Sequence, residues 1–197
     1  GSVKENKKPN PQSYYAHTKF KCEEIIKKSS LKYKFRYGIL RYFNVAGASS
    51  SGKIGEINAS HDHLIKNLAI QSNKKKPTIF VYGNDYKTKD GTCIRDYIHV
   101  DDLAAACIFL MKKYNDKEIV NIGTGLDISI KELALLIKST VGFNGEIYFD
   151  KEKPDGTPRK LLDVSKLNNL GWEHKINLVE GVKSVYEDYK EKYSLQE

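Results

Sequence analysis

Short apolar segments alternate with helix-like segments along most of this chain, and that alternation constrains its fold more than any other feature. Branched and aromatic residues typical of strands dominate five segments: 37–45, 78–82, 97–100, 118–122 and 146–149. Apolar residues at helical spacing mark the segments 13–29, 60–72, 101–114, 129–141 and 178–193. Strand and helix in alternation favour an α/β fold.

Capping residues predict where two of these helices begin. Ser129 is followed three residues later by Glu132, the pattern of a capping box. Asp101 and Asp102 stand at the expected start of the preceding helix, where acidic side chains are favoured as caps.

The composition is that of a globular domain and does not favour a membrane-spanning protein. The 197 residues are 40% hydrophobic and 29% charged, and no apolar run approaches the roughly 20 residues that a membrane span needs. Residues 1–2 resemble a cloning remnant, and no apolar signal segment follows them. Three cysteines in no recognisable spacing (Cys22, Cys93 and Cys107) predict a reducing, cytoplasmic setting.

The net charge of +8 does not by itself predict a nucleic-acid partner. Only four of the 33 cationic Lys and Arg residues are arginines, whereas planar recognition of phosphates and bases favours Arg. The densest run of lysines, at 74–76, ends an expected helix, where cations suit the helix dipole. We expect no nucleic-acid and no membrane partner, and a smaller anion such as a nucleotide diphosphate remains compatible.

Tyr15 and Lys19 form a Tyr-x-x-x-Lys pair at the spacing that places two side chains on one helix face. An ammonium beside a phenol stabilises the phenolate, which suits proton transfer at a sugar hydroxyl. The signal is weak alone, because a second pair, Tyr186 and Lys190, lies on the expected C-terminal helix without a supporting motif.

The glycine-rich turn that binds dinucleotides is absent from the sequence. No strand is followed by GxGxxG and a helix. Gly123-Thr124-Gly125 follows an expected strand but lacks the third glycine, so we interpret it as a tight turn.

An ordered set of motifs supplies the context that the Tyr15–Lys19 pair lacks. The strings LRYFNVAGA (40–48) and YGNDY…DGTCIRDYIHVDDLA (82–104) follow that pair in order. The set resembles the extended short-chain dehydrogenase/reductase family, and most closely its UDP-glucose 4-epimerases. The resemblance implies an α/β fold made of the C-terminal part of a Rossmann-type doubly wound sheet and a small substrate-binding lobe. Residues 37–45 and 118–122 would be Rossmann strands, and 46–100 and 142–180 the main parts of the lobe.

The resemblance also implies roles for individual residues. The position of Tyr15 is the acid/base, and that of Lys19 binds the nicotinamide ribose of NAD. Two residues would lie beside the nicotinamide: Tyr42 and Phe43. Six would bind the nucleotide sugar: Asn44, His63, Leu64, Tyr82, Arg95 and Asp155. Without that resemblance, Arg95 and Asp96 would be interpreted as a structural ion pair and Tyr82 as a core aromatic.

The remaining histidines give no metal site. His61 and His63 are spaced like a ligand pair, but no Cys or carboxylate cluster completes a site. We expect His99 to be structural and His17 to be exposed.

The two parts of the chain resemble different members of the family. From about residue 104 the sequence is more similar to GDP-L-fucose synthases, including KPDGTPRKLLDVSKLNNLGW at 153–172. In those enzymes the position of Asp155 is associated with substrate. The family's glycine-loop half has no counterpart here, so we interpret the chain as the C-terminal half of an epimerase produced by truncation, proteolysis or a split gene.

Three functions follow as expectations. The first is an NAD-dependent epimerase interconverting UDP-glucose and UDP-galactose, or their N-acetyl forms, through a 4-keto intermediate. The second is a GDP-L-fucose synthase-like epimerase-reductase, and the third is a nucleotide-sugar-binding fragment without catalysis. A separate N-terminal half would be a partner, and the complete enzyme would be a homodimer.

Overall fold

The computed structural model describes residues 1–47, 78–150 and 156–194, of which 189–194 by backbone alone. Strands and helices alternate as the sequence predicts, so the α/β fold is confirmed. The helix predicted at 60–72 lies outside the described residues. The described elements, in chain order, are α1 (Tyr14–Tyr33), β1 (Ile39–Arg41), β2 (Asn44–Ala46), β3 (Thr78–Tyr82), β4 (Ile94–His99), α3 (Val100–Lys113), β5 (Ile119–Asn121), β6 (Asp127–Ser129), α4 (Ile130–Thr140), β7 (Glu146–Asp150), β8 (Arg159–Lys160), α5 (Ser165–Asn169) and α6 (Leu178–Ser194).

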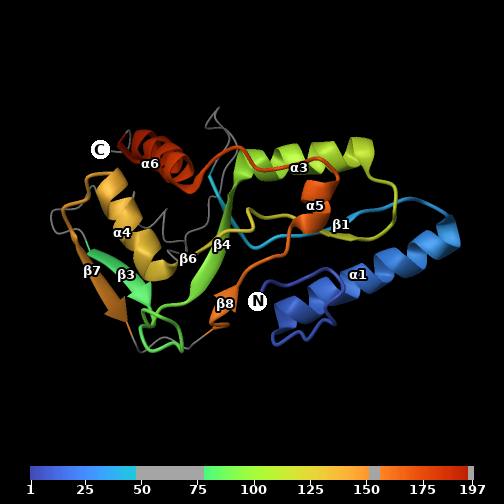
Figure 1. Ribbon diagram of the computed structural model, residues 1–197, viewed down its shortest axis with the longest axis horizontal. Coiled ribbons are helices and arrows are strands. Elements are labelled where there is room, and N and C mark those ends of the chain that lie inside the picture. Colours follow the sequence, from blue (N-terminus) through green and yellow to red (C-terminus); the bar gives the residue numbers. More distant parts are fainter. Residues whose placement is uncertain (48–77, 151–155, 195–197) are drawn as a thin grey trace.

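The described strands pair into small, mostly parallel sheets (Figure 1). β1 pairs with β5, and β3 pairs with β7, both in parallel. The long strand β4 lies at the centre of the third sheet, with β2 parallel on one edge. On the other edge β4 pairs antiparallel with β6. β8 pairs in parallel with the first two residues of β4, on the side opposite to β6. β4 therefore joins segments from distant parts of the chain.

The single strand predicted at 37–45 is wrong in one respect, because the chain forms two strands there. β1 pairs with β5, whereas β2 pairs with β4, and the chain changes sheets at Tyr42 and Phe43. The apolar pattern continues across this junction, so it does not reveal where a strand exchanges one partner for another.

Two short strands were not predicted, and β4 is longer than expected. β4 begins at Ile94 rather than at residue 97, and β6 and β8 are three and two residues long. Strands this short carry too few residues to show a period of two, and only their pairing with β4 defines them.

The helix caps confirm one prediction and correct another. α4 begins with the predicted capping box, in which Ser129 Oγ accepts from the Glu132 amide and Glu132 accepts from the Ser129 amide. α3 is capped by His99, whose Nδ1 accepts from the amide of Asp101. The carboxylate of Asp102 instead turns to a distant loop, where it accepts from the amides of Lys175 and Ile176.

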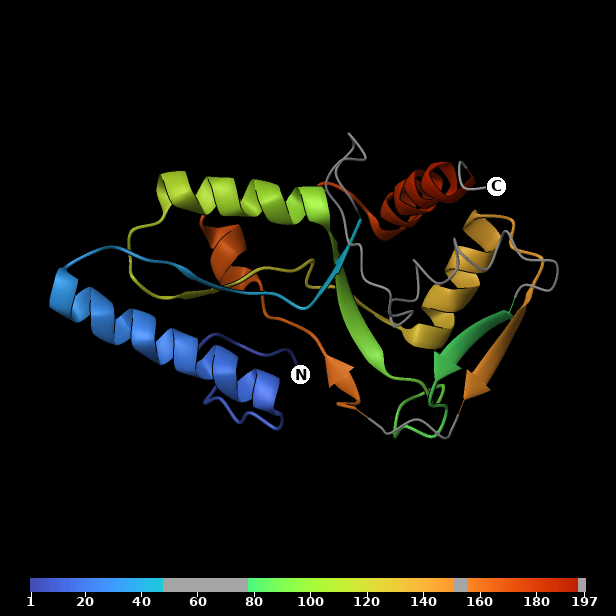
Figure 2. The ribbon, with the colours of Figure 1, turned by 180° about the vertical axis from the view of Figure 1, so that it is seen from behind.

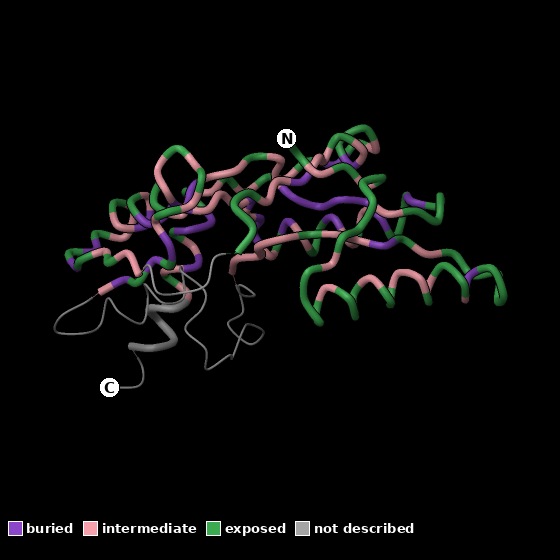
Figure 3. Tube along the Cα trace, turned by 90° about the horizontal axis from the view of Figure 1, so that it is seen from below, coloured by how far each residue is buried: buried purple, intermediate pink, exposed green. Residues whose placement is uncertain are grey.

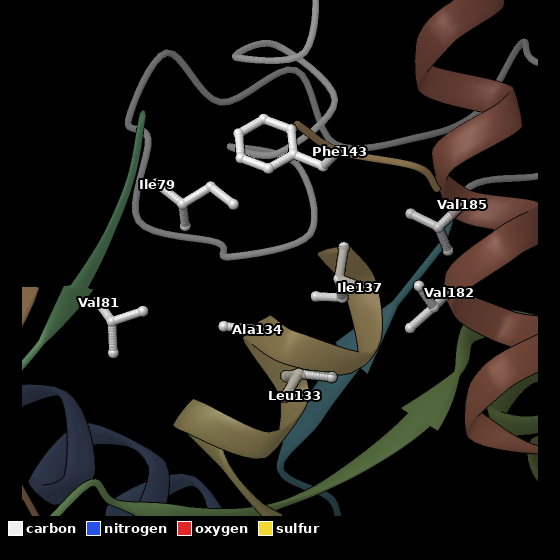
Figure 4. Close-up of a cluster of buried hydrophobic side chains, with 8 residues drawn as sticks. All are labelled: Ile79, Val81, Leu133, Ala134, Ile137, Phe143, Val182 and Val185. Carbon is white, nitrogen blue, oxygen red and sulfur yellow. The ribbon is translucent and has the colours of Figure 1, made fainter. Parts of the chain in front are cut away.

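Helix α4 organises the larger described core (Figure 4). Its Leu133, Ala134 and Ile137 are fully buried between β3 on one side and α6 on the other. Burying a side chain of Leu or Ile size contributes about 1.5–3 kcal/mol. The second core joins α3, β5 and α5, and includes Trp172.

Helix α1 lies apart from that packing, along one side of the molecule (Figure 2). Only Ser30 of its residues is buried, and Figure 3 shows exposed and intermediate residues along its whole length. An ion pair ties α1 to β1, with Arg41 Nη2 2.7 Å from Glu23 Oε2. No helix among the described residues has the length and apolar character that crossing a membrane requires.

Candidate functional site

Tyr15 and Lys19 are neighbours on the first turns of α1. Ser13 caps the helix by accepting from the Ala16 amide at 3.2 Å, and the helical spacing then stacks Lys19 over Tyr15. The Lys19 ammonium lies 5.3 Å from the centre of the Tyr15 ring, and the Tyr15 side chain is 72% exposed. The pair therefore offers a phenol with an adjacent cation to a ligand approaching from solvent.

The junction between β1 and β2 presents three of the predicted site residues in succession. Tyr42 is exposed and Phe43 is half-buried. Asn44 is half-buried, and its Nδ2 donates to the backbone oxygen of Asp96 at 2.8 Å. The Lys160 ammonium lies 6.0 Å from the centre of the Phe43 ring. The junction is thus linked through side chains to both β4 and β8.

Arg95 and Lys160 form a pair of neighbouring cations. They are register partners in the parallel pairing of β4 with β8. Arg95 Nη1 donates to the backbone oxygens of Ile94 at 2.8 Å and Pro158 at 3.4 Å. Burial lowers the pKa of the Lys160 ammonium, and the nearby charge of Arg95 lowers it further. Two like charges held together in this way favour an anion as ligand.

Lys160 is a candidate that the sequence analysis missed. It lies in the string TPRK, and nothing local distinguishes it from the many other lysines. Only the pairing of β8 with β4 brings it beside Arg95.

The ion pair considered for Arg95 and Asp96 does not occur among the described residues, because the carboxylate of Asp96 faces the turn at Gly123 to Gly125. It accepts from Thr124 N at 3.1 Å, Thr124 Oγ1 at 2.7 Å and Gly125 N at 3.2 Å. Burial raises the pKa of Asp96, although these hydrogen bonds act in the opposite direction. The chain bends at Gly123 and Gly125 between β5 and β6, in line with the turn predicted there.

This turn also bears on the cofactor. The amides that could hold a pyrophosphate there already bind a carboxylate, which would repel a second anion. Among the described residues, this turn is therefore not available to the pyrophosphate of a dinucleotide.

Tyr82 lies at the end of β3 with its side chain 41% exposed. Burial alternates along β3, so Ile79 and Val81 enter the core while Phe80 and Tyr82 point outward. Phe80 packs edge-on against Tyr148 of β7, with ring centres 5.6 Å apart. Tyr82 is therefore part of an outward aromatic face and not a core aromatic.

Three predicted site residues, His63, Leu64 and Asp155, lie outside the described residues. His17 is exposed, as predicted. His99 is buried, and its cap on α3 is a structural role, as predicted. Across the described ranges, no three His, Cys, Asp or Glu side chains are grouped as metal ligands would be.

Comparison with known proteins identifies the family of this fold. The profile of the "NAD dependent epimerase/dehydratase family" matches residues 2–123. The chain is 54% identical over 101 residues to a putative GDP-L-fucose synthase 2 of Arabidopsis thaliana, covering 51% of this chain and 31% of that protein. It is 38% identical over 185 residues to a putative UDP-glucose 4-epimerase of Methanocaldococcus jannaschii, covering 93% of this chain and 55% of that protein. The matched regions thus span 31% of the Arabidopsis protein and 55% of the Methanocaldococcus protein.

Solved structures agree in fold. A UDP-glucose 4-epimerase of Stenotrophomonas maltophila, with bound NAD and formylated UDP-arabinopyranose, superposes with a TM-score of 0.88 at 27% identity. It matches 99% of this chain, which covers 60% of that protein. A UDP-glucose 4-epimerase of Brucella ovis in complex with NAD gives a TM-score of 0.84 at 30% identity, over 96% of this chain and 60% of that one. The predicted resemblance and the Rossmann-type fold class are confirmed, and the chain belongs to the NAD-dependent epimerase/dehydratase family.

Proposed function

We propose that this chain is the nucleotide-sugar-binding part of an NAD-dependent epimerase that interconverts UDP-glucose and UDP-galactose. The observation that carries the proposal is the Arg95–Lys160 cation pair, together with the Asn44 amide of β2, which donates to the backbone oxygen of Asp96, the residue next to Arg95. Arg and Lys side by side suit the two phosphates of a nucleotide diphosphate. The Stenotrophomonas structure in the comparison holds a UDP-sugar and NAD, which supports the same ligand classes here.

In this proposal each side chain has a defined task. Arg95 and Lys160 bind diphosphate oxygens, and Asn44 donates to one of them. The outward ring of Tyr82 stacks on the nucleobase. Tyr42 and Phe43 lie beside the nicotinamide. His63, Leu64 and Asp155 are retained as substrate contacts on the family resemblance.

The chemistry centres on Tyr15. Tyr15, whose ring lies beside the Lys19 ammonium, would accept the proton of the sugar 4-hydroxyl as the C4 hydrogen leaves as hydride. When bound, NAD⁺ would supply the hydride acceptor and, once reduced, the hydride donor for the 4-keto sugar. Tyr15 would then return the proton to the C4 oxygen, which becomes the new hydroxyl, so no net oxidation occurs.

The assembly and location follow as further parts of the proposal. The pyrophosphate of NAD would be held by an N-terminal half of the epimerase, and the complete enzyme would be a homodimer. All three cysteines are free, which supports a reducing compartment such as the cytoplasm.

A second candidate function rests on the 54% identity to the Arabidopsis GDP-L-fucose synthase 2. The cation pair would bind the diphosphate of a GDP-sugar equally well, because it contacts neither the base nor the sugar. The difference would lie in the nucleobase pocket beside Tyr82.

Calorimetric titration tests the proposal and separates these candidates. UDP-glucose, GDP-L-fucose and NAD⁺ are each titrated into the chain. The proposal expects heat from UDP-glucose that saturates at one site per chain, and a weaker response to GDP-L-fucose. A preference for GDP-L-fucose would favour the second candidate, and no response to either nucleotide sugar would overturn both.

A further inference from the structure

Asp96 is the most completely buried carboxylate beside the candidate site, with 2% of its surface exposed. Its two oxygens take three hydrogen bonds, all from the turn at Thr124 and Gly125. A buried carboxylate is costly unless it is satisfied in this way, so these bonds hold β4 and the turn together.

The turn is shaped around this carboxylate. A Cβ added to Gly123 would lie 2.7 Å from Asp96 Oδ2, so the carboxylate would have to shift. Gly125 has a φ of +72°, a left-handed conformation that favours glycine. Both glycines therefore serve the Asp96 contact.

The same residue is linked to two candidate ligand-binding side chains. Its backbone oxygen accepts from Asn44 Nδ2 at 2.8 Å. Its neighbour on β4 is Arg95, and successive side chains of a strand point to opposite faces. Anchoring Asp96 on one face therefore holds Arg95 on the other face, next to Lys160.

We infer that Asp96 is a positioning residue of the substrate site, whose carboxylate fixes the segment of β4 that presents Arg95 and orients the Asn44 amide. This inference rests on the proposed function, because it assumes that Arg95 and Asn44 bind a nucleotide sugar. It extends that function by a residue that does not touch the ligand. Even a small displacement of these side chains should weaken their action on the ligand, because a misplacement of about 1 Å can change a reaction rate by roughly 100-fold.

The test compares two buried carboxylates of the same kind. In Asp96→Asn, the new side-chain NH₂ group would face hydrogen-bond donors of Thr124 and Gly125, so at least one of the present bonds would be lost. Asp102→Asn does the same where Asp102, 4% exposed, accepts from the amides of Lys175 and Ile176. Asp102 has no bond to Asn44 or to the Arg95 segment in the described structure, so it is a matched control for lost stability.

Three readouts are measured on each variant: the thermal midpoint, the Kd for UDP-glucose by calorimetry and the NMR signals of the Asn44 side-chain amide. Both variants are expected to unfold at lower temperature. Only Asp96→Asn is expected to weaken UDP-glucose binding, by about 10-fold or more, and to shift the Asn44 amide signals. Equal affinities in the two variants, or unmoved Asn44 signals, would overturn the inference.

A milder variant covers the case in which Asp96→Asn does not fold. Thr124→Val removes one donor, the hydroxyl 2.7 Å from Asp96 Oδ1, and leaves the carboxylate in place. It is expected to weaken binding by roughly 3- to 10-fold. Unchanged binding in this variant would count against the inference. Failure of the unaltered chain to bind any nucleotide sugar would instead overturn the proposed function, and the inference with it.

Discussion

Arg95 and Lys160 stand opposite each other as register partners of β4 and β8, and the pKa of Lys160 is lowered by burial and by the charge of Arg95. Register partners in parallel strands project to the same face, so the two cations repel each other until an anion joins them. A bound diphosphate would relieve that repulsion.

Replacing either cation should therefore weaken nucleotide-sugar binding. Each charge-assisted hydrogen bond to phosphate is worth about 1.5–3 kcal/mol, so Arg95→Ala or Lys160→Ala should raise the Kd for UDP-glucose by roughly 10- to 100-fold. The two losses should not add, because each residue acts on the other's environment. Calorimetry on the two single variants and the double variant measures this.

Arg36→Ala is the matched control for that experiment. Arg36 also makes a side-chain hydrogen bond, to Asn115 at 2.6 Å, but it lies in the segment between α1 and β1. Its replacement should leave the Kd unchanged. If Arg36→Ala weakened binding as much as Arg95→Ala did, general loss of positive charge would be the cause and the cation pair would have no special role.

The Asp90 carboxylate, in the turn before β4, should make a contribution to the free energy of unfolding that is lost in acid. Asp90 accepts from Thr92 N and from Ser129 Oγ, which caps α4. Burial alone would raise the pKa of Asp90, but these hydrogen bonds outweigh it and hold that pKa below its usual value. The lowered pKa means that the folded state favours the ionised form, so this contribution is present above pH 4 and is lost as the pH falls through the folded-state pKa.

Urea unfolding from pH 3 to pH 7 checks this prediction. At neutral pH, Asp90→Asn should lower the free energy of unfolding by about 1 kcal/mol, and the difference from the unaltered chain should shrink below pH 4. Asp116→Asn, at an exposed loop position, supplies the control for loss of a surface charge. A gap between Asp90→Asn and the unaltered chain that stayed constant with pH would contradict the account.

Helix α1 ends at a residue with a strained backbone, and replacing that residue with glycine should remove the strain. Lys34, its C-cap, has a φ of +55°, a left-handed conformation that costs a non-glycine residue about 1 kcal/mol. Lys34→Gly should raise the free energy of unfolding by somewhat less than that amount, as measured in urea. Lys32→Gly, inside the last turn, should lower it by about 1 kcal/mol. If both variants changed the free energy of unfolding in the same direction, the left-handed conformation of the cap would not be the cause of the change.

The local parts of this fold could be predicted from the sequence. The capping box at Ser129 and the strand at β3 depend on neighbouring residues alone, and both are where the pattern places them. The order of strands and helices follows from the same local periodicity.

Pairing between distant segments could not be predicted. No local signal shows that the chain leaves β5 for β4 at Tyr42 and Phe43. None shows that the two residues of β8 join β4, which is why Lys160 was missed. The cap of α3 was misassigned because Asp102, a good cap by type, is used by the loop at Lys175 and Ile176. Motif resemblance, and not periodicity, selected Tyr15, Asn44 and Arg95.

Epimerase activity is measured as UDP-galactose formed from UDP-glucose by the full-length protein with NAD⁺. We expect interconversion to an equilibrium mixture, with kcat reduced by roughly 100- to 10,000-fold in Tyr15→Phe, the usual worth of an acid/base group. Tyr14→Phe, the fully exposed neighbour, should keep its rate. Absence of UDP-galactose, or a Tyr15→Phe rate close to that of the unaltered protein, would contradict the assignment.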